Sequence, residues 1–136
     1  MKIFSSPVLT ALEKALDAAA LRESTIANNV ANVNTPGFKR SYVNFEEALQ
    51  KSLNPKSNFT LAADEQGHLQ AAENLETLQP EVATDYSTSM RQDGNNVDID
   101  SEMVQAAMNM INYNFAAAKA SSKLSILSYV ISGGNR

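Results

Sequence analysis

Apolar residues recur with alternating three- and four-residue spacing near the start of the chain, between Pro7 and Val33. The positions are Leu9, Leu12, Leu16, Ala19, Glu23, Ile26, Val30 and Val33. This spacing predicts a long helix with a narrow apolar seam, broken at Glu23, of the kind that pairs with another helix. Pro7 suits the first turn of a helix, and Ser5 or Ser6 is expected to cap its free N–H groups.

The strongest periodic pattern lies near the other end of the chain and predicts a second long helix. Its seam consists of Met103, Ala106, Met110, Tyr113, Ala117, Ala120, Leu124, Leu127 and Ile131. A second apolar line runs beside it, formed by Val104, Ala107, Ile111, Phe115 and Ala118. One partner helix cannot cover both lines, so this helix is expected to pack against several neighbours. Asp100 is the expected N-cap, and Gly133-Gly134 the expected end.

The middle of the chain has a much weaker pattern. Residues 38–43 alternate weakly and are expected to be extended, and Asn44 is placed to cap a short helix that ends before Asn54-Pro55. From 55 to 100, scattered glycines, prolines and short polar residues predict a long, partly extended segment with a weak β element near 59–69.

Together these patterns predict a mainly α protein. Long N- and C-terminal helices pair as a coiled-coil-like hairpin, with an extended, partly irregular or weakly β middle segment. The expected division is 1–40 for the first helix and its Pro-Gly exit, 41–100 for the middle, and 101–136 for the C-terminal helix that pairs with the first. At 136 residues, one modest core is expected.

The composition argues against several classes of function. A net charge of −4 gives no basic surface for nucleic acid. The absence of cysteine excludes disulfides and thiolate chemistry, and His68, the only histidine, cannot form a metal-binding pair. Glu13, Glu46 and Glu47 lie beside lysines or helix caps rather than beside a partner carboxylate. We therefore expect no catalytic residue, no metal, no cofactor and no enzyme.

The acidic segment from Asp93 to Glu102 invites comparison with a calcium-binding loop. Its spacing fails, because Val97 occupies a ligand position, Asp98 replaces the required glycine and Val104 stands where the bidentate glutamate belongs. A turn followed by a helix cap explains the segment better.

The chain is expected to carry neither a Sec-type signal nor a membrane span. Pro7 interrupts the first apolar residues, and Glu13 and Lys14 follow closely. The uncharged run from Met103 to Ala118 contains polar residues and is shorter than a bilayer crossing requires.

The expected end of the first helix has an unusual sequence, from Ala27 to Arg40. Asparagine disfavours a helix interior, Pro36 cannot continue a helix, and Gly37 readily takes the positive φ of a turn. This segment resembles the N-terminal signature of bacterial flagellar axial proteins (rod, hook and hook-associated subunits). The residues that carry the resemblance are Ala27, Asn28, Asn29, Asn32, Asn34, Thr35, Pro36, Gly37, Phe38 and Lys39.

A second segment, from Asp93 to Met103, looks like the D-G-N-x-V-x-[ILM]-[DE] start of the C-terminal helix in proximal rod proteins. The segments Val43–Glu46 and Leu61–Leu69 are similar to those proteins as well. The resemblance covers both ends and parts of the middle. It leaves open which of the sister proximal rod subunits the chain is.

The resemblance implies a structural subunit of the flagellar basal-body rod, which polymerises through its terminal helices into a helical tubular drive shaft. It implies as partners other copies of the chain, FlgC-like and FlgF-like rod subunits, the FliE adaptor and the flagellar type III export apparatus. It also implies a place in the rod where it crosses the periplasm, and export without a cleaved signal peptide. The assembly interface is expected at Leu9, Leu12, Leu16, Ile26, Val30, Val33, Met103, Met110, Tyr113, Leu124, Leu127 and Ile131.

Two other classes of protein compete with this interpretation. A cytoplasmic coiled-coil adaptor or export chaperone explains the seams equally well, but not the asparagine-rich Pro-Gly exit. A muramidase that opens the cell wall would need a pair of carboxylates flanking a glycosidic bond, and the sequence offers no such pair.

Overall fold

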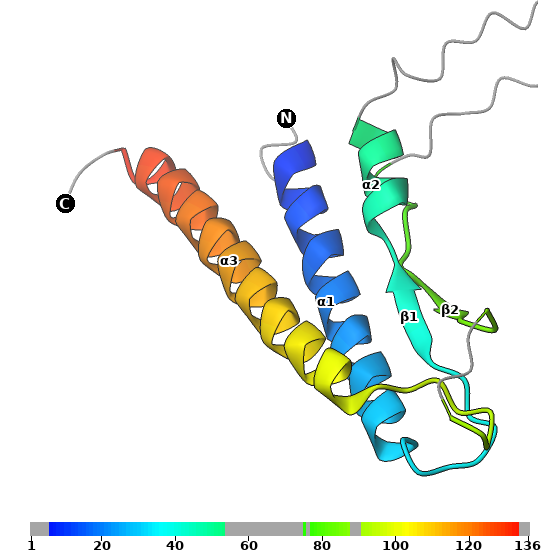
Figure 1. Ribbon diagram of the computed structural model, residues 1–136. Coiled ribbons are helices and arrows are strands. Elements are labelled where there is room, and N and C mark those ends of the chain that lie inside the picture. The colour runs from blue at the N-terminus through cyan, green and yellow to red at the C-terminus, as the bar shows by residue number, and fades with distance from the viewer. Residues whose placement is uncertain (1–5, 54–74, 76, 88–90, 134–136) are drawn as a thin grey trace, which may run out of the picture.

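The computed structural model of the chain describes residues 6–53, 75, 77–87 and 91–133. Its elements, in order, are α1 (Pro7–Ala31), β1 (Ser41–Asn44), α2 (Glu46–Leu53), β2 (Glu81–Thr84) and α3 (Ile99–Ile131). The helices α1 and α3 run antiparallel and pair, and α1 lies between α3 and the small sheet with α2 (Figure 1). The predicted mainly α architecture, with paired terminal helices, is confirmed.

Helix α1 begins at Pro7, as predicted, and ends two residues earlier than predicted. Ser6 is the N-cap, but its hydroxyl makes no capping bond, and its carbonyl instead accepts from the Leu9 N–H at 2.8 Å. The predicted capping by the Ser6 side chain is therefore wrong, and Ser5 lies outside the described residues. The helix ends at Ala31 because Asn32 leaves the helical conformation, with φ −103° and ψ 13°.

Helix α3 begins at Ile99, so the predicted N-cap at Asp100 is wrong. Asp98 is the cap, and its carboxylate accepts from the Asp100 N–H at 3.0 Å. Asp100 instead occupies the first turn, where the helix dipole favours a negative charge. The helix ends at Ile131, and Gly133 follows with φ +73°, a conformation that glycine adopts without strain.

The middle of the chain contributes a two-stranded antiparallel sheet in which Val43 pairs with Val82. Asn44 is the last residue of β1, so the prediction that it caps the short helix is wrong. The carbonyl of Phe45 takes that place and accepts from the Leu49 N–H at 2.9 Å. The β element predicted near 59–69 lies outside the described residues.

The hydrophobic core lies between α1, the sheet and the start of α2. Its buried members are Ala18, Val43, Phe45 and Leu78, and Ala15, Leu21, Ala48 and Leu49 pack against them. Helix α1 thus has two covered sides, one packed against this core and one against α3. None of the described helices is long and apolar enough for a bilayer crossing.

The side of α3 that packs on α1 differs from the predicted seam. The buried residues of α3 are Glu102, Asn109 and Ala116, which recur every seven residues. Met103 and Met110, one residue further along and about 100° further around the helix, are exposed. Within the single chain, the line that packs on α1 is therefore one residue away from the predicted apolar seam. Polar contacts explain this orientation of α3, because Glu102 and Asn109 form hydrogen bonds with residues of α1.

Candidate functional site

The two segments that resemble rod proteins meet at one end of the hairpin. There the end of α1, the loop that follows it, the start of β1 and the segment before α3 lie together (Figure 1). Most bonds between them join residues about sixty positions apart in the chain. We call this region the junction, and it consists of residues 29–41 and 91–105.

Asn95 binds the turn that follows α1. Its side-chain nitrogen donates to the carbonyls of Asn32, Val33 and Thr35, at 3.1, 3.1 and 2.9 Å. All three carbonyls belong to the turn that follows Ala31, the last residue of α1. Asn95 is fully buried, at 0% exposure, and its amide therefore binds this turn out of contact with water.

The position of Asn95 is fixed by bonds within its own loop. Its Oδ1 accepts from the Val97 N–H at 2.7 Å, and its own N–H donates to Oδ1 of Asp93 at 3.1 Å. The guanidinium of Arg91 donates to the Val33 carbonyl at 2.9 Å, beside the Asn95 contact. The loop before α3 is therefore shaped to bind the end of α1.

Asn29, in the last turns of α1, joins three elements. Its Oδ1 accepts from the Ser41 N–H at 2.9 Å, and its Nδ2 donates to the Ser41 carbonyl at 2.7 Å. The side-chain amide thus pairs with β1 as a neighbouring strand would. The same Nδ2 also donates to Oε2 of Glu102 at 3.0 Å, which connects α1 and β1 to α3.

Glu102 is the most buried charge of the junction, with a fully buried side chain. Its Oε1 accepts from Nε of Arg40 at 2.5 Å, and Nη2 of Arg40 donates to Oε1 of Gln105 at 2.8 Å. A buried carboxylate is stable only with a paired cation and satisfied hydrogen bonds, and Arg40 and Asn29 supply both.

The backbone at Arg40 is held by two further residues. Its N–H donates to Oδ1 of Asn96 at 2.6 Å, and its carbonyl accepts from the Asp85 N–H at 2.8 Å. Nδ2 of Asn96 closes the ring by donating to the Asp85 carbonyl at 2.9 Å. The Ser87 hydroxyl and N–H, which donate to the Asp85 carboxylate, hold the pKa of that carboxyl below its ordinary value.

Two glycines allow the loops of the junction to approach each other. Gly37 and Gly94 have φ of +71° and +83°, and the predicted positive φ of Gly37 is confirmed. The Gly37 N–H donates to the Asp93 carbonyl at 2.9 Å, and Nζ of Lys39 donates to the Gly94 carbonyl at 2.8 Å. A side chain at Gly94 would meet Gly37 Cα at 3.8 Å, so the main requirement there is the backbone conformation.

The other signature residues act locally. Nδ2 of Asn32 donates to the Asn28 carbonyl at 2.9 Å, and the Thr35 hydroxyl donates to Oδ1 of Asn32 at 3.2 Å. These side chains bond the backbone of the last turn, as expected of asparagines that end a helix. Phe38 is half-buried, and the exposed signature residues are Ala27, Asn28, Asn34, Thr35, Pro36 and Gly37.

The junction's chemistry is structural. Its carboxylates and amides bond the neighbouring backbone and side chains, and among the described residues no three acidic, histidine or cysteine side chains converge on a cation position. The acidic residues Asp93, Asp98 and Asp100 serve a turn and a helix start. The arrangement can fix the orientations of α1, β1 and α3 relative to one another.

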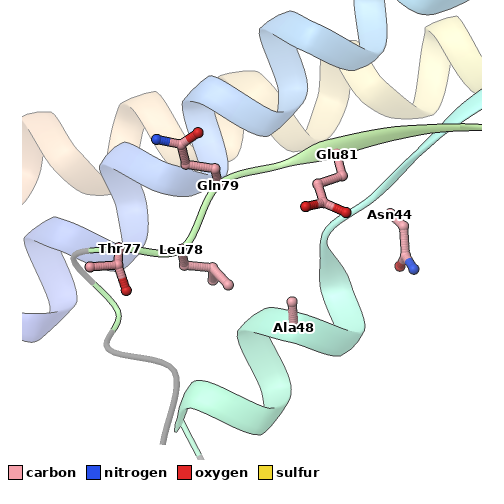
Figure 2. Close-up of a pocket in the computed structure, with 6 residues that line it drawn as sticks. All are labelled: Asn44, Ala48, Thr77, Leu78, Gln79 and Glu81. Carbon is pink, nitrogen blue, oxygen red and sulfur yellow. The ribbon is translucent and has the colours of Figure 1, made fainter. Parts of the chain in front are cut away.

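A pocket of about 360 Å³ lies at the other end of the sheet. Figure 2 shows Ala48 on α2 and Asn44 and Glu81 at the end of the sheet, together with Thr77, Leu78 and Gln79. Glu81 is the single carboxylate among these lining residues. The pocket thus lacks the pair of carboxylates that glycosidic bond cleavage uses.

The residues predicted for assembly on α1 are largely covered within the chain. Ile26 is buried, and the half-buried members are Leu9, Leu12, Leu16, Val30 and Val33. Glu23, the predicted break in this seam, is exposed, and its Oε2 accepts a hydrogen bond from Nδ2 of Asn109 in α3 at 2.9 Å. The break in one helix therefore faces a polar residue of the other.

The residues predicted for assembly on α3 are mostly open to solvent in the single chain. Leu127 is half-buried, and the exposed ones are Met103, Met110, Tyr113, Leu124 and Ile131. Turned away from α1, on the other flank of α3 from Met103 and Met110, lies a line of four more exposed apolar residues, which we call the outer face: Val104, Met108, Ile111 and Phe115. Whether neighbours cover these residues stays a prediction.

Several residues of the junction escaped the sequence analysis: Arg40, Ser41, Asn95, Asn96, Glu102 and Gln105 bond across it. One signal was available, since a glutamate and an asparagine seven residues apart, Glu102 and Asn109, form a polar line at heptad spacing directly beside the predicted apolar seam.

Comparisons with known proteins identify the family of the chain. The sequence model of the family described as flagella basal body rod protein matches residues 9–39. The flagellar basal body rod protein FlgB of Borrelia hermsii is 42% identical over 118 residues, which cover 84% of this chain and 87% of that protein. The FlgB protein of Bacillus subtilis is 32% identical over 134 residues, which cover 98% of this chain and 99% of that protein.

The chain belongs to the FlgB family of flagellar basal body rod proteins. It is therefore a structural subunit of the flagellar basal-body rod, and the adaptor or chaperone alternative is not favoured. The more distant FlgB of Escherichia coli is 27% identical over 127 residues, which cover 90% of this chain and 91% of that protein. The signature from Ala27 to Lys39 falls within the part that the family model matches.

Proposed function

We propose that this FlgB-family chain polymerises through α1 and α3, with copies of itself and with other rod subunits, into the proximal part of a helical tubular shaft. The observation that carries the proposal is the outer face of α3. Ile111 and Phe115 on this face are 68% and 64% exposed in the single chain. A continuous apolar line of this kind on a soluble chain marks a surface that a partner covers.

The partner that fits this surface is another long helix. The outer face follows four- and three-residue spacing, which is the pattern that knobs-into-holes packing between helices requires. Covering it removes apolar area from water, and each Å² contributes about 25 cal/mol. The charge-free stretch from Met103 to Ala118 offers nothing to a phosphate backbone, which favours a protein partner.

The junction supports the same function in a different way. Because Asn95, Asn29 and Glu102 fix three elements to one another, each subunit presents its outer face at one reproducible angle. A regular helical tube requires identical contacts from each copy, and a subunit with loosely connected helices would not supply them. This argument joins the buried polar network to the exposed apolar face.

The further partners in this proposal are FlgC-like and FlgF-like rod subunits, the FliE adaptor and the flagellar type III export apparatus. The subunit acts without catalysis and reaches the periplasm without a cleaved signal peptide.

The test is to purify basal bodies from cells that express the chain and to identify the subunit by mass spectrometry of the intact protein. The proposal predicts that the protein co-purifies with rods and begins at Met1 or Lys2. A protein that stays in the soluble fraction would contradict the assembly role. Loss of about twenty N-terminal residues would contradict the export route.

A further inference from the structure

Helix α3 could pack on α1 by either of two neighbouring lines. The line that does so contains Glu102 and Asn109 with Ala116, and all three are buried. The line one residue further around contains Met103 and Met110, and both are exposed by more than half. Apolar burial alone favours the methionine line, so another interaction decides the choice.

Asn109 makes that interaction near the middle of the helix pair. Its Nδ2 donates to the Ala19 carbonyl at 3.0 Å and to Oε2 of Glu23 at 2.9 Å. Glu23 interrupts the apolar seam of α1, so the polar residue of α1 contacts the polar residue of α3 at this level of the helix pair. Glu102 makes the corresponding contact seven residues earlier, through Asn29.

Asn109 does not have the features of a residue retained for stability. It is 3% exposed, and its Oδ1 has no hydrogen-bond partner among the described residues. An unpaired buried acceptor is unfavourable, and an apolar residue of similar size would avoid it. Buried asparagines at helix pairs are known instead to fix register and partner at a cost in stability.

We propose that Asn109 and Glu102 select the side of α3 that packs on α1. By holding this side inward, they keep Met103 and Met110 outward and set the orientation of the outer face. A further consequence is that neighbouring rod subunits contact the outer face in this orientation. Only that consequence rests on the proposed function. The selection itself is a property of the single chain.

The chain contains no cysteine, so single cysteines report the exposure of each side without background. Ala116→Cys reports the inward side, and Met103→Cys reports the outward side. The alkylation rate of each is measured on the full-length chain with Asn109 intact and with Asn109→Ala. Asn112→Ala is the matched control, because Asn112 is an exposed asparagine of the same helix.

If Asn109 selects the side, Asn109→Ala allows α3 to rotate, and the two reporters change in opposite directions. Alkylation at position 116 becomes about tenfold faster and alkylation at position 103 becomes about threefold slower, while Asn112→Ala alters neither. Faster reaction at 116 without slower reaction at 103 means that Asn109 only stabilises the pair, and it overturns the proposal. Unchanged rates at both positions overturn it as well.

Glu23→Ala provides a second variant in case Asn109→Ala does not fold. It removes one of the two acceptors of Asn109 from an exposed position and leaves the buried residues intact. The proposal predicts the same opposite changes, smaller in size, and unchanged rates contradict it. Since these assays use the free chain, their failure is distinct from a failure of rod assembly.

Discussion

The side-chain nitrogen of Asn29 donates to Oε2 of Glu102 at 3.0 Å, although 73 residues separate the two in the chain. Asn29 belongs to the asparagine-rich end of α1, and Glu102 to the first turns of α3. Their contact joins the two segments whose sequences resemble rod proteins. Each segment therefore supplies donors or acceptors to the other.

Glu102→Leu is expected to destabilise the free chain by about 3–5 kcal/mol, because it leaves Arg40 without its buried counter-ion. Urea denaturation measures the change. Glu13→Leu is the matched control at an exposed position of α1, with an expected change below about 0.5 kcal/mol. Equal effects of the two substitutions would contradict a special role for Glu102.

Asn95→Ala is expected to lower the free energy of unfolding by about 1–3 kcal/mol, since three carbonyls of the turn after α1 lose a buried donor. Asn95→Asp is expected to cost more, because it places a carboxylate oxygen against those carbonyls. The control is Asn34→Ala, at an exposed position of the same signature. An Asn95→Asp chain as stable as the parent would show that the turn after α1 does not depend on the Asn95 amide.

The sequence predicted those features that depend on local chemistry. Pro7 begins α1, Gly37 takes a positive φ and Glu23 breaks the seam, because each follows from the residue itself and its near neighbours. The N-cap of α3 was predicted at Asp100 and lies at Asp98. Aspartate caps helices well, and the two residues are only two positions apart, so the sequence does not distinguish them.

The features that could not be predicted depend on partners distant in the chain. A pattern of apolar spacing identifies the most apolar side of α3. It cannot predict that Asn109 donates to the carbonyl of Ala19, 90 residues away. The role of Asn95 could not be predicted for the same reason: its partners lie across the junction. Polar bonds of this kind decide orientation, while apolar periodicity reports only the potential to pack.

The carboxyl of Asp85 is expected to titrate below the ordinary aspartate pKa of 3.8, because two groups of Ser87 donate to its charged form. Any stability it contributes is present above the unfolded pKa and is lost as the pH falls through the lower folded pKa. Ser87→Ala removes the hydroxyl and keeps the N–H, so the pKa should rise part of the way. Carbon-detected NMR titration measures it, and a pKa that stays unchanged would contradict this hydrogen bond.

Ile111→Gln is expected to leave the free chain as stable as the parent within about 0.5 kcal/mol, because the side chain is exposed there. In cells it should reduce the number of basal bodies with complete rods and impair swimming, since the polar group would be buried between subunits without a partner. Val82→Gln, an exposed apolar residue on β2, is the matched control and should leave rods intact. Normal rods with Ile111→Gln would count against the outer face as an interface.

The central claim, that neighbouring helices cover the outer face of α3, is tested most directly by a cryo-EM map of assembled rods in which side chains are resolved. We expect Ile111 and Phe115 to pack against a helix of an adjacent subunit, with Glu102 and Asn109 still turned toward α1 of their own chain. A map in which Ile111 and Phe115 face solvent, and subunits touch only through other surfaces, would contradict the claim.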